Sequence, residues 1–139
     1  MNVLLTGGAG YIGSHAALSL LDCGHNVHIV DDLSTGNESL IPKNAKFTNC
    51  NINDEKVISA LIQSNKFDLL MHFAGFIQVE ESVKYPEKYF ENNTDNAIKL
   101  FNICKNNGLN KIVFSSTAAA YGSVNENKLI DENTNLNPQ

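Results

Sequence analysis

The residues with the clearest chemistry lie in a glycine-rich stretch, Thr6-Gly7-Gly8-Ala9-Gly10-Tyr11-Ile12-Gly13. Glycine allows backbone torsions and a close approach that a Cβ atom would block. An apolar run precedes this stretch and a segment of helical period follows it, so the first amides of the helix and its dipole would face an anion. The stretch therefore predicts a turn that binds phosphate.

Asp31 ends the next apolar run, about twenty residues after the glycines. Alone, the glycines could form a flexible turn and the aspartate could be a solvated turn residue, but together they favour binding of an adenine dinucleotide. Asp31 would accept hydrogen bonds from the ribose hydroxyls and would repel a 2′-phosphate. Because all 10 basic residues are lysines, no arginine compensates for that repulsion. We therefore expect NAD and not NADP.

Short apolar runs alternate with segments of helical period along nearly the whole chain. The runs are rich in Val, Ile, Leu and Phe without polar alternation, which is typical of parallel strands covered on both faces. The expected strands are residues 3–6, 27–31, 46–50, 69–73 and 112–115. The expected fold class is α/β, a Rossmann-like doubly wound parallel sheet of about five strands with the first strand central and helices on both faces. Residues 1–139 would form one NAD-binding domain of this kind, in incomplete form.

Three helices are expected between these strands, over residues 11–23, over residues 55–64 and from Pro86 onward. The third has the clearest pattern, because six of its side chains recur at spacings of three and four. These residues are Phe90, Asn93, Ala97, Leu100, Phe101 and Cys104. Gly108 follows where a helix cap belongs. Residues 125–139 have little apolar periodicity, so we expect a loop there.

Composition excludes several classes of function. The net charge of -5 argues against a nucleic-acid surface. No window approaches ~18 apolar residues and the amino terminus begins directly with a strand-like run, so neither membrane insertion nor secretion is expected. Cys23, Cys50 and Cys104 are odd in number and far apart, which predicts buried reduced thiols, no metal site and a cytoplasmic location.

With these residues in place, the chain resembles the extended short-chain dehydrogenase/reductases, and among them most closely the UDP-galactose (UDP-glucose) 4-epimerases. Four segments carry the resemblance: TGGAGYIGSH (6–15), DDLSTGN (31–37), HFAG (72–75) and SSTAAAYG (115–122). The first is shared by many nucleotide-sugar enzymes. The second and third together point more narrowly to epimerases.

The resemblance implies a set of site residues in this chain. Thr117 would take the place of the family's catalytic serine or threonine. The NAD contacts would fall on Gly7, Gly10, Tyr11, Ile12, Gly13, Asp31, Asp32, Leu33, Ser34, Thr35, Gly36, Asn51, Ile52, Phe73, Ala74, Gly75, Phe76, Ile77 and Asn92.

Two positions depart from the family pattern. Asn51 stands where relatives usually have an aspartate facing the adenine amine, so its carbonyl could accept a hydrogen bond only without charge assistance. Ile77 stands where some relatives have a lysine near the cofactor, so we expect it only to pack. His72 is expected to be a satisfied, partly buried histidine rather than an acid or base, and Tyr121 to line or pack the site.

In this family a tyrosine with a lysine four residues later moves the hydroxyl proton, the ammonium lowering the pKa of the tyrosine. None of the tyrosines here, Tyr11, Tyr85, Tyr89 and Tyr121, has a lysine at that spacing. The terminal Asn-Pro-Gln resembles the stretch a few residues before the family's tyrosine. We therefore expect an amino-terminal portion that lacks the substrate lobe and shows no turnover alone.

The expected function is the NAD-binding portion of a nucleotide-sugar 4-epimerase, which interconverts UDP-glucose and UDP-galactose, or their N-acetyl forms, through a 4-keto intermediate. The intact enzyme would take a UDP-sugar as substrate. A 4,6-dehydratase or decarboxylase, a non-catalytic NAD-binding module and an incomplete product that binds nothing tightly remain alternatives. Strand 112–115 would leave an apolar unpaired edge, which predicts self-association into a homo-oligomer.

Overall fold

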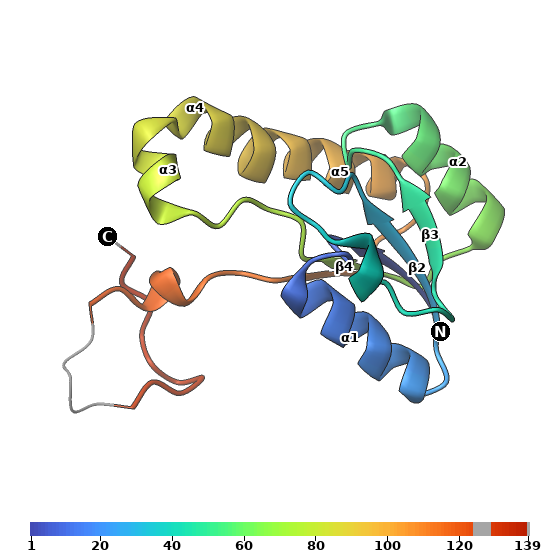
Figure 1. Ribbon diagram of the computed structural model, residues 1–139, viewed down its shortest axis with the longest axis horizontal. Coiled ribbons are helices and arrows are strands. Elements are labelled where there is room, and N and C mark those ends of the chain that lie inside the picture. Colours follow the sequence, from blue (N-terminus) through green and yellow to red (C-terminus); the bar gives the residue numbers. More distant parts are fainter. Residues whose placement is uncertain (124–128, 139) are drawn as a thin grey trace.

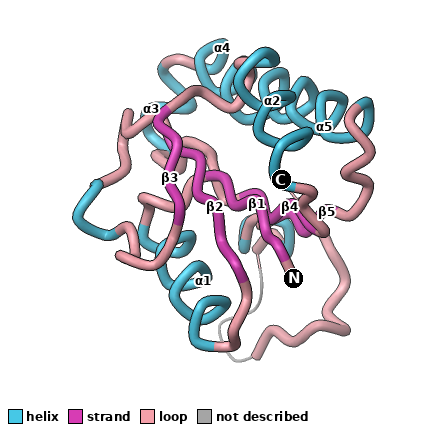
Figure 2. Tube along the Cα trace, turned by 90° about the vertical axis from the view of Figure 1, so that its right-hand side faces the viewer, coloured by secondary structure: helices cyan, strands magenta, loops and turns pink. Residues whose placement is uncertain are grey.

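The computed structural model describes residues 1–123 and 129–138. Five parallel strands form one sheet in the order β3-β2-β1-β4-β5 (Figures 1 and 2). The strands are β1 (Asn2–Thr6), β2 (Asn26–Asp31), β3 (Lys46–Asn49), β4 (Leu69–His72) and β5 (Ile112–Phe114). Because β1 pairs with β2 on one side and with β4 on the other, the strand order reverses at β1. The predicted doubly wound sheet with a central first strand is confirmed.

Helices cover both faces of the sheet, as Figures 1 and 2 show. Helix α1 (Tyr11–Asp22) lies on one face, and α2 (Glu55–Asn65) and α5 (Asn96–Asn106) lie together on the other. The neighbouring residues Leu4 and Leu5 are both fully buried, Leu5 in the cluster with α1 and Leu4 in the cluster with α2 and α5. Successive strand residues point to opposite faces, so a strand covered on both sides must be apolar throughout.

Local sequence accounts for the ends of the helices on the second face. Asp54 caps α2, because its carboxylate accepts the N–H of Val57 at 3.1 Å. After α5 the chain turns at Gly108, whose φ of 82° lies in the left-handed region. Glycine adopts that region without a steric cost, which confirms the predicted cap.

The segment that follows Pro86 differs from the single regular helix predicted. Helix α4 (Pro86–Tyr89) continues into a π-helical stretch, η2 (Phe90–Asp95), before α5 begins. A π-helical turn holds more residues than an α-helical one, so it changes which side chains face the sheet. Tyr89 is only 9% exposed whereas Phe90 is 67% exposed. The predicted place of Phe90 on the buried face is therefore wrong.

Three short elements were not predicted. They are α3 (Val79–Lys84) and the 3-10 turns η1 (Glu38–Leu40) and η3 (Ala118–Tyr121). Residues 129–138 contain no helix or strand, in agreement with the predicted loop. Residues 125–128 and 139 of that loop lie outside the described residues.

The three cysteines occupy different surroundings, and all three thiols are free. Cys104 is buried and Cys50 is half-buried, but Cys23 is exposed, so the predicted burial of Cys23 is wrong. Cys23 follows the last turn of α1, beyond the residues that pack on the sheet. Burial raises the pKa of the Cys104 thiol to about 11, which keeps this thiol protonated and unreactive. Over the described ranges, none of the helices combines the length and the apolarity that crossing a membrane requires.

Candidate functional site

The glycine turn joins the carboxyl end of β1 to α1. Gly7 has a φ of 77°, and its N–H donates to the carbonyl of Val30 in β2 at 3.0 Å. A Cβ atom on Gly7 would overlap the backbone of Ala74, and one on Gly13 would overlap the carbonyl oxygen of Gly7. Only glycine therefore lets the ends of β1 and β4 and the first turn of α1 meet at one point.

The first turn of α1 presents free amides beside this turn. Gly10 is the N-cap residue, and no side chain caps the helix. The N–H of Ser14 bonds back to the Gly10 carbonyl at 3.0 Å. The amides of Tyr11, Ile12 and Gly13 precede that bond and have no acceptor within the helix. These donors and the positive end of the helix dipole suit a phosphate.

The Asp31 carboxylate is held at the end of β2 beside the turn. Asp31 is 9% exposed. Its Oδ2 accepts the N–H of Ala9 at 3.0 Å, and its Oδ1 accepts the N–H of Leu33 at 2.9 Å. A Cβ atom on Gly36 would lie 2.9 Å from Oδ1, so the glycine leaves room for the carboxylate. Each oxygen can still accept another hydrogen bond, so the carboxylate is oriented and remains able to bind a hydroxyl.

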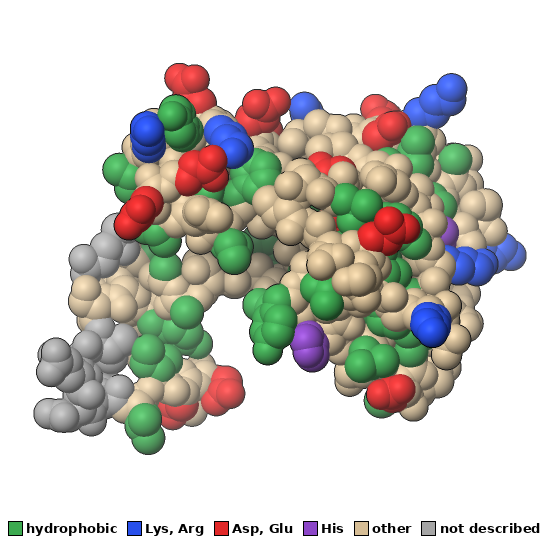
Figure 3. Space-filling model, viewed as in Figure 1, with side chains coloured by type: hydrophobic (Ala, Val, Ile, Leu, Met, Phe, Trp, Pro, Cys, Tyr) green, Lys and Arg blue, Asp and Glu red, His purple; other side chains and the backbone are tan. Residues whose placement is uncertain are grey.

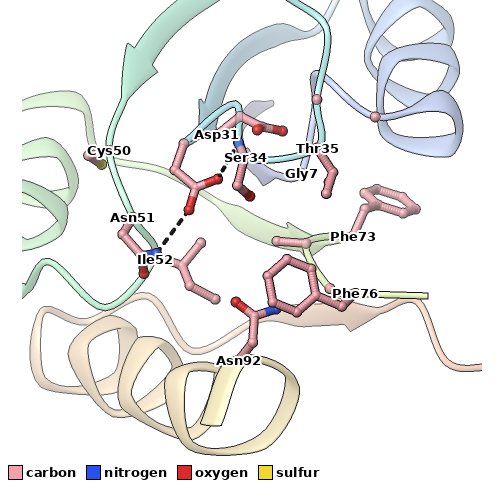
Figure 4. Close-up of a pocket in the computed structure, with 15 residues that line it drawn as sticks. Gly7, Asp31, Ser34, Thr35, Cys50, Asn51, Ile52, Phe73, Phe76 and Asn92 are labelled. Carbon is pink, nitrogen blue, oxygen red and sulfur yellow. Dashed lines mark hydrogen bonds between the residues drawn. The ribbon is translucent and has the colours of Figure 1, made fainter. Parts of the chain in front are cut away.

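We call the cavity at this edge of the sheet the first cavity (Figure 4). Its volume is about 90 Å³. It lies at the carboxyl ends of β1, β2 and β4, where the strand order reverses and where ligands bind in sheets of this kind. Its lining residues are Gly7, Gly10, Asp31, Asp32, Ser34, Thr35, Gly36, Cys50, Asn51, Ile52, Phe73, Ala74, Gly75, Phe76 and Asn92.

A hydrogen bond joins two polar residues that line the first cavity. The Nδ2 of Asn51 donates to Oδ2 of Asp32 at 2.9 Å, and Oδ1 of Asn51 accepts the N–H of Asn53 at 3.1 Å. The carboxylate requires a donor and the Asn53 amide requires an acceptor, so the two partners fix the orientation of the Asn51 side chain. An aspartate at position 51 would set a second negative charge against Asp32. The neutral side chain that departs from the family pattern is thus the one that suits Asp32.

We call the neighbouring hollow, of about 450 Å³, the second cavity. Figure 3 shows a hollow between the side that carries α3 and α4 and the side that carries α1. Residues 73–76 line both cavities and form their common wall. Thr117 is exposed and lines the second cavity. Its Oγ1 accepts the N–H of Ala119 at 3.2 Å, so its own O–H remains free to donate.

Five predicted contact residues lie outside the first cavity. Ile12 and Ile77 line the second cavity and are 62% and 89% exposed. Tyr11, which is 76% exposed, lines neither cavity, and neither do Gly13 and Leu33. Gly13 is buried beneath the turn. The structure therefore divides the predicted contact set between two cavities and their supporting turn.

Cys50 and Asn93 are among the cavity-lining residues that were not predicted contacts. Cys50 lines the first cavity. Burial, with the nearby Asp54 and Asp32 carboxylates, raises the pKa of the Cys50 thiol to about 11, so it is not a reactive group at neutral pH. Asn93 hydrogen-bonds the backbone of Phe76. In the sequence these two residues stand out only because they are next to the predicted contacts Asn51 and Asn92. That position does not reveal the cavity that Cys50 lines or the backbone that Asn93 binds.

His72 is hydrogen-bonded, as predicted, but it is more deeply buried than the partly buried histidine that was expected. It is 1% exposed, and its Nδ1 lies 2.6 Å from Oγ1 of Thr6. Its ring stacks on Phe114 with centroids 5.6 Å apart and meets the edge of Phe101 at 5.4 Å. Burial lowers the pKa of His72 to about 4. The ring is therefore neutral at physiological pH and ties β1 to β4 and β5.

Over residues 1–123 and 129–138, no three His, Cys, Asp or Glu side chains come close enough together to hold a metal ion. The model of the NAD dependent epimerase/dehydratase family matches residues 3–139. The chain belongs to this family.

Relatives within the epimerase/dehydratase family are similar along most of this chain. It is 42% identical over 138 residues to a UDP-glucose 4-epimerase of Lactobacillus helveticus, a match that covers 99% of this chain and 42% of the relative. It is 44% identical over 121 residues to a UDP-glucose 4-epimerase of Azospirillum brasilense, covering 87% of this chain and 35% of the relative. The chain thus spans less than half the length of these curated relatives.

Solved structures of the epimerase/dehydratase family share its fold. A UDP-glucose 4-epimerase from Stenotrophomonas maltophila with bound NAD and formylated UDP-arabinopyranose superposes with a TM-score of 0.88 at 37% identity, covering 98% of this chain and 42% of that one. The UDP-glucose 4-epimerase of Thermus thermophilus in complex with NAD gives a TM-score of 0.89 at 34% identity, covering 99% of this chain and 45% of that one. The doubly wound sheet is therefore shared with enzymes that bind NAD.

Proposed function

We propose that the first cavity and the adjoining glycine turn bind NAD. The observation that carries the proposal is the buried Asp31 carboxylate, which accepts two backbone N–H groups and lines the same cavity as Gly7 and Gly10. The residues present fit the cofactor, because the α1 amides lack a side-chain cap and the Asp31 carboxylate oxygens can each accept another hydrogen bond. NAD complexes of relatives with the same fold support this proposal.

Each part of NAD has a complementary group in this proposal. The pyrophosphate would lie against the amides of Tyr11 and Ile12 at the start of α1. The adenosine ribose hydroxyls would donate to Asp31, and the adenine would lie beside Asn51 and Ile52. The nicotinamide half would then extend past the wall of residues 73–76 towards the second cavity. A 2′-phosphate would meet the Asp31 charge without a compensating arginine, so NAD is favoured over NADP.

For the whole protein we propose nucleotide-sugar 4-epimerization, the interconversion of UDP-glucose and UDP-galactose. When bound, NAD supplies the acceptor and donor of hydride at the sugar C4. Thr117 would hold a sugar hydroxyl by hydrogen bonding in the second cavity. Similarity at 39% identity to a putative UDP-arabinose 4-epimerase of Arabidopsis thaliana supports the 4-epimerase reaction but leaves the sugar open. The Tyr-x-x-x-Lys pair is absent from these 139 residues, so we expect no turnover from them alone.

Calorimetric titration of the 139-residue chain tests the cofactor proposal. NAD should bind, and NADP should bind at least about tenfold more weakly, because an uncompensated contact between two charges costs more than about 1.4 kcal/mol in a partly dry site. UDP-glucose conversion by the same sample should be undetectable. Equal affinity for NAD and NADP, or no heat from NAD, would contradict the proposal.

We also propose that copies of the chain associate through β5. All three residues of β5 are exposed, Ile112 by 38%, Val113 by 47% and Phe114 by 54%, and an exposed apolar edge strand is a template for pairing. Light scattering at working concentration should give a mass above that of one chain, and Val113→Lys should lower it. A monomeric mass for the unmodified chain would reject this proposal.

The free thiols support a further proposal, that the protein works in a reducing compartment, namely the cytoplasm. Fractionation of cells should recover it with cytoplasmic markers. Recovery with a secreted or periplasmic fraction would contradict this location.

A further inference from the structure

One side chain of η2 satisfies the backbone of the wall between the cavities. Oδ1 of Asn93 accepts the N–H of Phe76 at 2.8 Å, and Nδ2 of Asn93 donates to the carbonyl of Phe76 at 2.9 Å. Phe76 follows β4 and has left the sheet, so no neighbouring strand supplies these bonds. The amide of Asn93 takes the place of a pairing strand at this residue.

The ring of Phe76 is held from the same helical segment. The Tyr89 ring lies 5.6 Å from the Phe76 ring, and Nζ of Lys88 lies 4.8 Å from its centroid. Glu81 in α3 accepts hydrogen bonds from Tyr89 at 2.8 Å and from Lys88 at 2.6 Å. Tyr89 and Asn93 are four residues apart and both face Phe76. The π-helical stretch and the turn before it thus hold the backbone as well as the ring of this residue.

The Asn93 side chain also lies against Gly75 in the wall between the two cavities. A Cβ atom on Gly75 would lie 3.4 Å from Oδ1 of Asn93. Asn92 lines the first cavity and donates to the same Oδ1 at 2.9 Å, whereas Asn93 lines the second. Oδ1 of Asn93 therefore contacts a residue of the first cavity and lies against the common wall at Gly75 and Phe76.

We propose that Asn93 is a positioning residue for the nicotinamide half of NAD. It holds residues 73–76 in place, and these residues guide the dinucleotide from the first cavity into the second. This inference rests on the NAD site proposed above. The adenine and diphosphate contacts of that site lie on the glycine turn, on Asp31 and on Asn51, and none of these groups bonds to Asn93. ADP, which lacks the nicotinamide half, should therefore not depend on Asn93.

The experiment measures NAD and ADP affinity for the unmodified chain and for three variants. Asn93→Ala removes both bonds to Phe76 and the bond from Asn92, and it should weaken NAD about tenfold, while ADP affinity stays within about twofold. Asn93→Asp keeps the acceptor and loses the donor, so it should weaken NAD about threefold. Thr94→Ala changes an exposed neighbour in the same stretch and should alter neither affinity.

Hydrogen exchange gives a second measurement that needs no cofactor. The Phe76 amide should exchange faster in Asn93→Ala than in the unmodified chain, while the amides of β1 keep their protection. Equal weakening of NAD and ADP, no weakening of NAD, or an unchanged exchange rate at Phe76 would each overturn the inference and leave the NAD site standing. An unmodified chain that binds neither nucleotide would overturn the proposed function and this inference together.

Discussion

The two cavities lie on either side of one wall, yet they are built differently. The first is framed by the ends of buried strands, and the bonds that shape it join backbone amides to the buried Asp31 carboxylate. The second borders segments that are largely exposed, including β5 and Ile12, and the side chain of Asn93 holds the wall that it shares with the first. The strand ends of the sheet therefore shape the first cavity, whereas side chains of the segments around the sheet shape the second.

The strongest test of this contrast acts on the turn beneath the first cavity. Gly13→Ala would overlap the Gly7 carbonyl and should lower the free energy of unfolding by about 3 kcal/mol or more, because backbone atoms cannot move aside as a side chain can. Denaturant unfolding measures this loss. Gly10→Ala is the control, since its Cβ would meet only one atom, at 3.3 Å, and its fold should persist. Equal losses would show that the turn is not tightly packed.

Acid should lower the free energy of unfolding through His72, whose ring stacks on Phe114 of β5. Burial lowers the pKa of His72 to about 4, below the ordinary value of about 6.5. Above about pH 6.5 the ring is neutral in both the folded and the unfolded chain, so its titration does not change the free energy of unfolding. As the pH falls from about 6.5 to about 4, the unfolded chain takes up a proton that the folded chain excludes, so the free energy of unfolding falls by up to about 3 kcal/mol.

Unfolding curves of the unmodified chain and of His72→Asn, measured between about pH 7 and about pH 4, check this dependence. The variant should lose most of it, although burial and Lys46 also lower the pKa of His28, so some dependence should remain. His15→Gln, at an exposed position, is the control and should keep the full dependence. An unchanged slope in His72→Asn would remove His72 as the cause.

Asp31→Asn tests the first cavity without changing its shape. The amide keeps one acceptor but loses the charge, and its nitrogen would face a backbone N–H, so NAD affinity should fall about thirtyfold. Selectivity for NAD over NADP should fall with it. Calorimetric titration measures both effects, and Asp22→Asn, at the end of α1 away from the cavity, should change neither. Unaltered NAD affinity in Asp31→Asn would mean that the dinucleotide binds elsewhere.

The smallest effect is expected at Thr117, in the second cavity. Thr117→Ala removes one hydroxyl that accepts the Ala119 N–H at 3.2 Å. Because this residue is exposed and lies outside the first cavity, NAD affinity should change by less than about twofold. Titration with NAD decides the point. A tenfold loss would show that the two cavities are not separable and would break the comparison.

Sequence determined the features that rest on local physical constraints. Unbroken apolar runs require cover on both faces, and their alternation with helices predicted the parallel sheet that was found. The glycines at positions 7 and 13 can carry no Cβ atom, and the residue ending β2, Asp31, necessarily comes to the same edge of a parallel sheet. Most of the predicted contacts line the first cavity for this reason, although binding at them stays a prediction.

Tertiary structure alone decided which side chains of a helix are buried and which residues far apart in the sequence become partners. The π-helical stretch buries Tyr89 and exposes Phe90, a shift that a regular period of about 3.6 residues cannot reveal. The bonds from Asn93 to Phe76 and from Asn51 to Asp32 join residues that lie 17 and 19 positions apart. A polar side chain takes whichever partner the fold brings near it, so residue types and spacing could place these side chains near the site but could not say what they hold.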